Sequence, residues 1–401
     1  MMAKRFLDPF FPNRPVDDPD RFAGRNTQVD EAIDSLYQIA NGNPKHTIIT
    51  GDRGIGKSSL LFQTRLVAQG DNRLPERLGV DMGCDGYDFV CASHDAAPDQ
   101  DVGILASGLL RDLQTTVGRF LEKFSLELNL GGVLTVGQRT PENVSIADIV
   151  HGFCTEVEKA FKQIEKKNKT GLLFFIDEVD RLPVDCGAAT FFKLATEKLA
   201  RDGWTKTGFI CAGITGAIQD MENEHASIFR VFRDILIPRL ESNEVAQILE
   251  DGFNKVKCSY EESVAAKTVK LCAGFPEPVH IMGSEMLSVD IDKNIDDTDF
   301  DNAKEKVLKE VRRNKLHSML QQAGSGRYQE IVNAMANYDK THVPVAHISK
   351  ALGLEQNQFS VNMGELIKKN VIARVDRGVY CFVDPLLKEY IRAFGPISFD
   401  T

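Results

Sequence analysis

Short uninterrupted apolar runs alternate along the first half of the chain with longer stretches in which apolar residues recur at helical spacing. The runs predict strands that are buried on both faces, at residues 47–50, 87–93, 171–176 and 208–215. The longer stretches predict helices at residues 27–40, 101–124 and 188–202. Strands that alternate with helices in this way predict a parallel, doubly wound α/β sheet.

One segment departs from this pattern. Residues 125–137 alternate between apolar and polar around Gly131 and Gly132, which predicts a β-hairpin inserted into the α/β core. We interpret it as a structural hairpin, although its outward residues could contact a neighbour.

The second half of the chain has a different pattern. Residues 242–288 read as wholly helical and predict a small helical domain, which an acidic stretch at residues 290–299 separates from a helix that runs to about Gln322. From Arg327 onward the pattern predicts three helices and a two-stranded hairpin, at residues 328–336, 345–352, 356–369 and 371–383. Three helices followed by a hairpin predict a winged helix-turn-helix.

A glycine-rich turn follows the first strand. The segment from Gly51 to Ser59 has the spacing G-x-x-x-x-G-K-S, with apolar residues on both sides. Its glycines allow backbone N–H groups to surround an anion, and the start of the next helix adds partial positive charge. Lys57 can reach the β and γ phosphates of a nucleotide, and Ser58 can hold Mg²⁺. We therefore predict a phosphate-binding loop formed by Gly51, Gly54, Ile55, Gly56, Lys57, Ser58 and Ser59.

Two carboxylates end the third predicted strand. Asp177 and Glu178 follow five large apolar residues, so they lie at the carboxyl edge of the sheet, where open α/β sheets bind ligands. Asp177 can enter the Mg²⁺ shell, and Glu178 can orient and activate a water molecule against the γ phosphate. The pair favours ATP hydrolysis over nucleotide binding alone and makes kinase chemistry less favoured.

Composition limits the other possibilities. The chain has 401 residues, which predicts two to three domains, and its hydrophobic content is ordinary for a globular protein. No apolar stretch approaches 18 residues and the first residues lack a signal core, so we expect a cytoplasmic protein with no membrane partner. Eight scattered cysteines without a C-x-x-C pair argue against a zinc or redox site.

The charge distribution bears on nucleic acid. A formal net charge of −10 argues against a chain that coats nucleic acid over its whole surface, but a local module remains possible. In the predicted winged helix, Lys368, Lys369, Arg374 and Arg377 suit phosphate contacts, and a Gln/Asn-rich helix suits base edges. Residues 327–401 carry nine Lys/Arg and eight Asp/Glu, so duplex DNA and protein docking both stay open.

Taken together, these motifs resemble those of AAA+ type ATPases. More narrowly, the chain resembles archaeal and STAND-like ATPases that neighbour the origin-recognition initiator clade. The resemblance rests on five segments that span nearly the whole chain, residues 21–25, 47–59, 174–182, 225–240 and 381–390. It implies an AAA+ core at residues 1–240, a helical lid at 241–290, linker helices at 291–326 and a winged helix at 327–401, with ATP and Mg²⁺ as cofactors.

The resemblance also implies roles for single residues. It assigns Phe22, Gly24 and Arg25 to the adenine pocket, and Thr215 to a polar sensor that helps place the attacking water. Arg230, or failing that Arg233, would be an arginine finger that reaches a neighbouring subunit, a contribution of about 10³–10⁵ in turnover in enzymes that use one. Both arginines have an equally good reading as partners of ion pairs on the surface.

The lid departs from the family's pattern. Gly274, Phe275 and Pro276 form the Gly-x-Pro typical of STAND-like members, but no arginine stands where many AAA+ lids sense the γ phosphate. His280 could substitute, although a histidine on a helix face is more often structural. Slow turnover fits this pattern better than a fast motor.

We therefore expect an ATP-driven switch that assembles into an oligomer and engages DNA or a partner through its winged helix. The alternative is a STAND-like defence or signalling ATPase, whose winged helix docks protein and which activates a separate effector protein. A scaffold that binds nucleotide without hydrolysis is disfavoured by Glu178.

Overall fold

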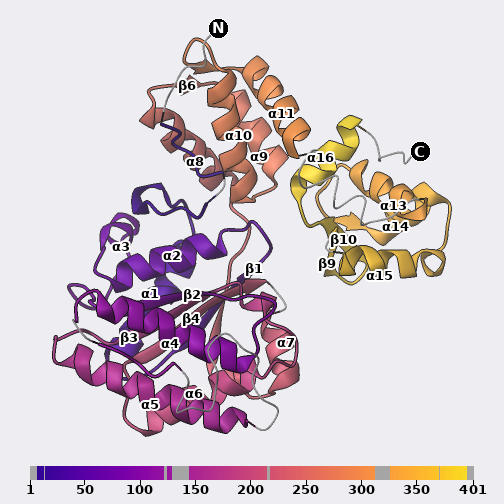
Figure 1. Cartoon of the computed structure of the whole chain (residues 1–401). Helices are drawn as coiled ribbons and strands as arrows, with labels where there is room; N and C mark the ends of the chain where they lie inside the picture. Colours follow the sequence, from indigo (N-terminus) through magenta and orange to yellow (C-terminus); the bar gives the residue numbers. More distant parts are fainter. Residues whose placement is uncertain are drawn as a thin grey trace. The chain divides into compact units, whose positions relative to one another are not determined.

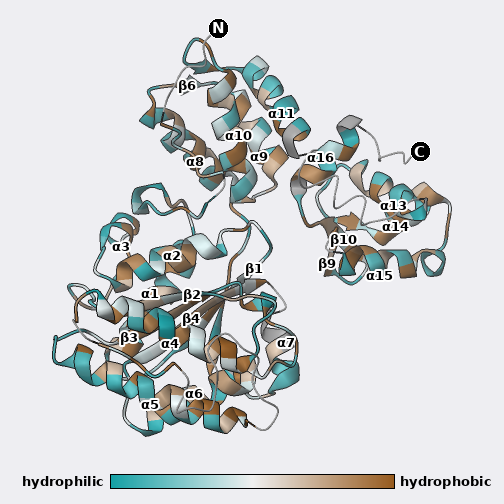
Figure 2. Cartoon of the chain, in the orientation of Figure 1, coloured by the Kyte–Doolittle hydropathy of each residue, from teal (hydrophilic) through white to brown (hydrophobic). Residues whose placement is uncertain are grey.

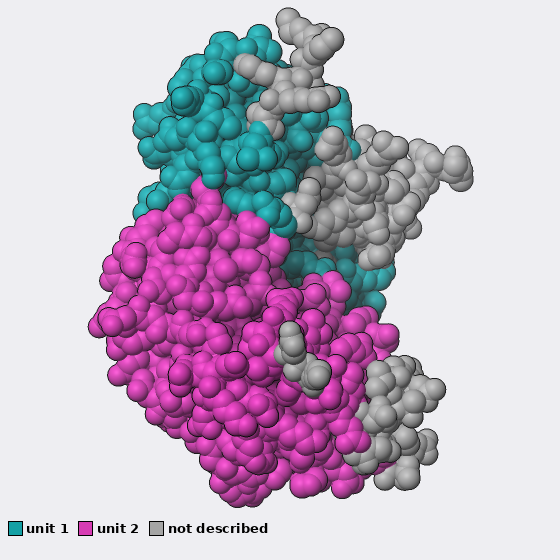
Figure 3. Space-filling view, turned by 60° about the vertical axis from the view of Figure 1, so that its left-hand side comes forward, with its two compact units in different colours: residues 1–14, 53–55, 239–401 teal, residues 15–52, 56–238 magenta. Residues whose placement is uncertain are grey.

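The computed structural model describes residues 7–12, 14–121, 124–128, 144–214, 217–311, 326–369 and 371–394. The chain divides into two compact units (Figure 3). We call residues 15–52 and 56–238 the core unit, and residues 1–14, 53–55 and 239–401 the lid unit. Among the described residues, no helix is long and apolar enough to span a membrane.

The core unit is built on a five-stranded parallel sheet with the order β2-β3-β4-β1-β5 (Figure 1). The strands are β1 (His46–Gly51), β2 (Val90–Asp95), β3 (Leu172–Asp177), β4 (Thr207–Ile214) and β5 (Phe232–Leu236). The residues of these strands are largely apolar (Figure 2). In β3, every residue except the last, Asp177, is buried. This confirms the parallel α/β sheet that the apolar runs predict.

Helices cover both faces of this sheet. They are α1 (Asn26–Ala40), α2 (Lys57–Ala68), α3 (Arg73–Leu78), α4 (Val102–Gly118), α5 (Ile146–Glu165), α6 (Ala188–Arg201) and α7 (Ala217–Glu224), with 3₁₀ turns η1 (Pro19–Arg21), η2 (Val179–Arg181) and η3 (Ile228–Arg230). Rings from α5 and α6 pack against the sheet, and Phe174 stacks on Phe209 with centroids 5.1 Å apart. The sequence pattern predicts α1, α4 and α6. It does not predict α5, although Ser145 caps the N-terminus of α5 and the apolar face of that helix is buried.

The predicted hairpin at residues 125–137 lies mostly outside the described residues. Its described part, residues 125–128, contains no strand.

The lid unit contains the helices α8 (Ser242–Lys255), α9 (Glu262–Cys272), α10 (Pro276–Val289) and α11 (Asp297–Val311). The prediction that residues 242–288 are wholly helical was wrong at one place. A two-residue strand, β6 (Ser259–Tyr260), pairs in parallel with β7 (Asn294–Ile295). The break begins at Lys257, whose left-handed backbone (φ 58°) ends α8.

The N-terminal arm is part of the lid unit. The ring of Phe10 lies against Gly252 of α8 and Gly283 of α10, where a Cβ at either glycine would come within 2.2 and 2.4 Å of the ring. Phe10 also meets Phe253 edge-on, with centroids 5.5 Å apart, and Ser284 donates to Asp8 at 2.5 Å. The sequence gives no sign of this packing, because nothing local shows which helix glycines accept an aromatic ring.

The C-terminal elements have the order of a winged helix. They are α13 (Arg327–Ala336), β8 (Val343–Pro344), α14 (Val345–Leu352), η5 (Gln356–Gln358), α15 (Ser360–Lys368), β9 (Ile372–Asp376), β10 (Val379–Phe382) and α16 (Pro385–Phe394), with the antiparallel order β8-β10-β9 (Figure 1). One helix was expected at 356–369, but the chain breaks at Phe359 (φ −133°), whose side chain is fully buried. The Phe359 ring packs in the core of this domain.

Candidate nucleotide site

The phosphate-binding loop follows β1, between its neighbours β4 and β5 in the sheet. Gly54 (φ 74°) and Gly56 (φ 105°) both have left-handed backbone, which side-chain-bearing residues rarely adopt. Gly56 directly precedes α2 and caps it, so the loop ends at a helix N-terminus. Backbone N–H groups at such a terminus bind anions, which fits the predicted role of this loop.

Lys57, the first residue of α2, folds back over the loop. Its ammonium group donates to the carbonyl oxygens of Gly51 at 3.1 Å and Asp52 at 2.9 Å. These carbonyls hold the charge beside the loop, where phosphate oxygens are stronger partners for an ammonium group.

Ser58 and Asp177 lie together. The Ser58 hydroxyl lies close to the Asp177 carboxylate at the end of β3, and the Glu178 amide donates to the same carboxylate at 2.8 Å. Burial raises the pKa of Asp177, and the nearby Ser58 hydroxyl and Glu178 amide oppose that effect. Two hard oxygen donors in contact fit Mg²⁺, which proteins bind through one or two carboxylates together with substrate phosphates. The pair therefore fits the metal role predicted for both residues.

A further carboxylate at this edge was missed by the sequence analysis. Asp95, the last residue of β2, is paired in register with Asp177, and its charge also raises the pKa of Asp177. Residues paired in a parallel sheet place their side chains on the same face. The only signal for Asp95 in the sequence was that the strand predicted at residues 87–93 has a polar end. Asp95 lies two residues beyond that predicted end.

Glu178 has an unusual backbone. Its φ of 56° places it in the left-handed region, and it begins the 3₁₀ turn η2. Its carboxylate forms an ion pair with Arg181 at 2.9 Å, with both side chains roughly half exposed. A strained residue that is not glycine is a common feature of functional sites, which agrees with the predicted catalytic role.

Asp180 holds the end of the neighbouring strand β4. Its carboxylate accepts a hydrogen bond from the Ile214 amide at 3.0 Å. The predicted sensor Thr215 follows Ile214 but lies outside the described residues. Asp180 is therefore a positioning residue for the end of β4, a role that the sequence analysis did not assign.

The predicted adenine residues precede α1. Phe22 is buried, and Gly24 and Arg25 both have left-handed backbone (φ 63° and 66°). The buried Arg25 guanidinium donates to the carbonyl oxygen of Pro238, the last residue of the core unit. Arg25 thus fixes the exit of the chain from the core unit, in addition to any role near a base.

Three further residues predicted for nucleotide binding have structural surroundings of their own. Ser59 accepts a hydrogen bond from the Val16 amide at 3.1 Å, and Gln63 donates to the Val16 carbonyl at 2.8 Å. Ile55 is buried. Pro276 opens α10 in the lid unit, where its missing N–H costs nothing. The nucleotide-binding roles of Ser59, Ile55 and Pro276 stay predictions.

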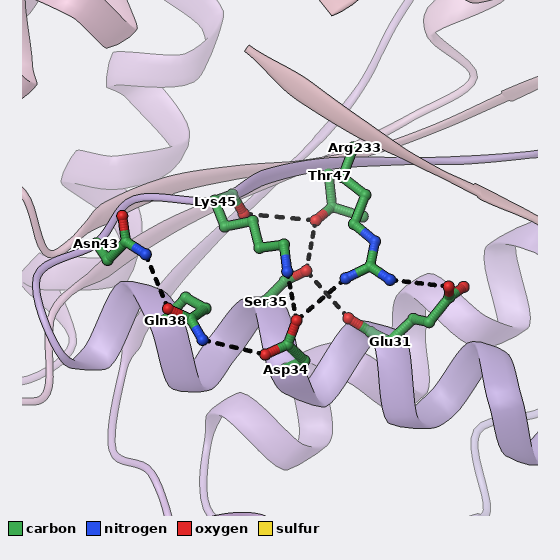
Figure 4. Close-up of polar contacts among 8 residues, drawn as sticks. All are labelled: Glu31, Asp34, Ser35, Gln38, Asn43, Lys45, Thr47 and Arg233. Carbon is green, nitrogen blue, oxygen red and sulfur yellow. Dashed lines mark hydrogen bonds and ion pairs between the residues drawn. The ribbon is translucent and has the colours of Figure 1, made fainter. Parts of the chain in front are cut away.

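The structure distinguishes the two candidate arginine fingers. Arg233 on β5 forms ion pairs with Glu31 at 2.9 Å and Asp34 at 3.1 Å on α1 (Figure 4). Asp34 also binds Lys45, and this cation lowers the pKa of Asp34. Arg233 therefore joins β5 to α1 within its own chain, whereas Arg230 is exposed at the end of η3. These positions favour Arg230 as the residue available to a neighbour.

His280 lies inside the lid unit. It is buried, and its ring meets those of Phe10 and Phe11 edge-on, with centroids 6.2 and 5.8 Å away. These contacts favour the structural reading of His280.

The winged-helix cations are accessible but partly engaged. Lys368 forms an ion pair with Glu365 at 3.2 Å, and Lys369 lies over the ring of Tyr328. Arg374 and Arg377 are exposed on the wing, although Arg374 donates to the carbonyl oxygen of Asp376 at 3.4 Å. Acidic groups therefore accompany the predicted phosphate contacts.

The arrangement of loop, acidic strand end and sheet order defines a P-loop ATPase fold. By sequence, no characterised protein matches the chain. A family described as a domain of unknown function (DUF8462) matches residues 314–391, which are well under half of the chain.

Solved structures agree on the fold. The Walker-type ATPase PABY2304 of Pyrococcus abyssi is 19% identical, with a TM-score of 0.59 over 94% of this chain and 98% of its own. The ORC2 protein of Aeropyrum pernix, solved in ADPNP–ADP complexes, is 13% identical, with a TM-score of 0.56 over 96% of this chain and 98% of its own. The chain therefore has the AAA+ type P-loop fold that its motifs predict.

Proposed function

We propose that the chain is a Mg²⁺-dependent ATPase that works as a slow, nucleotide-driven switch. The proximity of the Ser58 hydroxyl to the Asp177 carboxylate is the observation that carries this proposal, because it brings the predicted phosphate-binding loop together with the acidic end of β3. That pairing supplies metal ligands beside the backbone N–H groups and the ammonium group that a triphosphate requires.

In this proposal each residue has a separate task. Lys57 and the loop amides bind the phosphates, and Ser58 and Asp177 hold Mg²⁺, which neutralises developing charge on the phosphates when it is bound. Glu178 orients the attacking water, and it must leave Arg181 to do so. Their ion pair is roughly half exposed, so its loss costs at most about 1 kcal/mol.

Self-association supplies the remaining group. An exposed Arg230 contributes to hydrolysis when it reaches the nucleotide of a neighbouring subunit, since cationic fingers stabilise charge in the transition state. Mixing Arg230→Ala with Lys57→Ala protein tests this idea, because the first keeps an intact nucleotide site and the second keeps the finger. Partial recovery of turnover supports assembly, whereas two inactive proteins that stay inactive when mixed remove the finger from the proposal.

The winged helix has two candidate partners. Its exposed cations support duplex DNA as one of them. Protein docking, as in a STAND-like ATPase that activates a separate effector, is favoured by a different observation. Val361 on α15 is 75% exposed and Val375 on the wing is 47% exposed, and base recognition uses neither apolar side chain.

The central experiment separates binding from hydrolysis. Calorimetry with ATP and Mg²⁺ should show lost affinity for Lys57→Ala, while Glu178→Gln should bind ATP normally and hydrolyse it at least tenfold more slowly. Glu197→Gln on α6 is the matched control, because its exposed side chain pairs only with Lys193 among the described contacts. Full ATP affinity in Lys57→Ala, or full turnover in Glu178→Gln, would contradict the assignment.

A further inference from the structure

We propose that the lid unit contains a second ligand site, for a small phosphate-bearing molecule, in a pocket lined by α9, β10 and α16. The pocket has a volume of about 350 Å³, within the range of sites that bind small molecules. Every lining residue lies between Val269 and Arg392, so the pocket belongs wholly to the lid unit, and none of its lining residues belongs to the predicted phosphate-binding loop.

Positive charge is in excess in this pocket. Its lining includes four cationic side chains, Lys270, Lys340, Lys388 and Arg392, against two acidic ones, Asp339 and Glu389. Glu389 is already engaged, since it forms ion pairs with Lys304 of α11 at 2.9 Å and with Arg392 at 3.4 Å. Asp339 is fully exposed and lies 3.7 Å from Arg392. The two acidic groups therefore neutralise the charge of Arg392 more than they neutralise the charges of the lysines.

Lys388 shows the effect of this excess most directly. Its ammonium group donates to the carbonyl oxygen of Lys340 at 2.9 Å, and no ion pair is found for it among the described residues. Burial lowers the pKa of Lys388, and the charges of Arg392 and Lys270 lower it further, against the effects of Glu389 and Asp339. An anion between these cations would relieve this repulsion.

The remaining walls select the kind of anion. Val269, Leu271, Ala273, Phe275 and Phe382 also line the pocket, so its wall is partly apolar beside the cations, although the two phenylalanine rings are themselves largely buried. A molecule that combines a phosphate group with a flat apolar part, such as a mononucleotide, satisfies both features. Because α9 belongs to the helical region and α16 to the winged helix, a bound ligand would contact both parts and stabilise their packing.

The test uses the full chain with the Lys57→Ala change, which disables the phosphate-binding loop, and calorimetric titration with ADP and with pyrophosphate. In this background we expect Lys388→Met to weaken binding at least tenfold and Lys270→Met to weaken it severalfold. Lys309→Met, an exposed residue of α11 outside the pocket, is the matched control and should have no effect. Lys388→Arg keeps the charge and should restore most of the affinity.

Other outcomes would overturn the proposal. Equal affinity in all these proteins would show that the residual binding belongs to the phosphate-binding loop or is non-specific. Absence of binding at millimolar ADP and pyrophosphate would remove the site. If only duplex DNA binds, and binds through Lys270 and Lys388, the pocket recognises a polymer backbone and the small-ligand proposal is wrong. Lys270 is exposed, so Lys270→Met remains informative if Lys388→Met does not fold.

Discussion

Protonation of His46 should destabilise the core unit in mildly acidic solution. His46 opens β1 and is buried, and its Nδ1 accepts a hydrogen bond from the Phe209 amide at 3.1 Å. Its ring also packs against Phe209 and Phe232, with centroids 5.6 and 5.9 Å away. A proton on Nδ1 would remove the acceptor and place an unpaired charge among aromatic rings.

The magnitude follows from the pKa values. Burial lowers the pKa of His46 from 6.5 to about 4. Because the folded pKa is the lower one, the unfolded chain binds more protons between these values, and stability is present above pH 6.5 and is lost as the pH falls towards 4. The two pKa values correspond to about 3 kcal/mol in full, of which about 2 kcal/mol is lost between pH 7 and pH 5.

The assay can observe the core unit alone. Trp204 is the single tryptophan of the chain and packs against Phe161, with centroids 5.4 Å apart, so its fluorescence reports unfolding of the unit that contains His46. Urea unfolding at pH 7 and pH 5 gives the loss of stability for the natural protein and for His46→Asn, whose side-chain oxygen can still accept from Phe209.

The variant should be less stable at pH 7, because it loses the ring contacts, but its loss between pH 7 and pH 5 should be smaller by about 2 kcal/mol. His151→Asn is the matched control, since His151 is exposed on α5 and should leave the pH dependence unchanged. The same pH dependence in His46→Asn and the natural protein would refute the reasoning.

Three further predictions concern other parts of the chain. Phe10→Ala should destabilise the lid unit by about 3–5 kcal/mol, because it empties the space that the ring fills between two helix glycines. Hydrogen exchange in α8 and α10 should accelerate, and unchanged protection of these helices would contradict the prediction. Asp95→Asn should raise severalfold the Mg²⁺ concentration needed for ATP binding, while Asp99→Asn should not; equal midpoints would remove Asp95 from the site. If about four cations contact duplex DNA, the log–log salt slope is near −3.6, and Arg374→Ala/Arg377→Ala should reduce its magnitude by nearly two; anisotropy without binding at low salt would favour protein docking.

Four strands of the sheet and the glycine-rich turn after β1 could be predicted because their signals are local, whereas β5 was missed. An unbroken apolar strand specifies burial on both faces, and glycines at 51, 54 and 56 specify a turn that other residues cannot adopt. The end of β3 was equally clear, since Asp177 and Glu178 follow directly from the strand.

Other features depend on contacts between distant residues. The ion pairs of Arg233 with α1 required knowledge that β5 lies beside β1, some 190 residues away along the chain. The break at Phe359 required knowledge that its ring is buried, since residues 356–369 contain no proline to end a helix. Pairing of Asp95 with Asp177 depends on strand order and register, which apolar runs alone do not determine.

The proposed nucleotide switch requires a physical connection between the nucleotide site and the part that responds. Apart from the short segment 53–55, the chain passes from the lid unit to the core unit after Arg14 and returns after Pro238. Next to the first passage Val16 is held by Ser59, the neighbour of the predicted metal ligand Ser58, and at the second Pro238 is held by Arg25. A shift of α2 or of the segment before α1 on nucleotide binding would therefore move both ends by which the lid unit is attached. Ser59 and Arg25 both lie within the predicted nucleotide motifs. Each of them binds a backbone group at one of the two attachment points, so each can connect the nucleotide site to the lid unit.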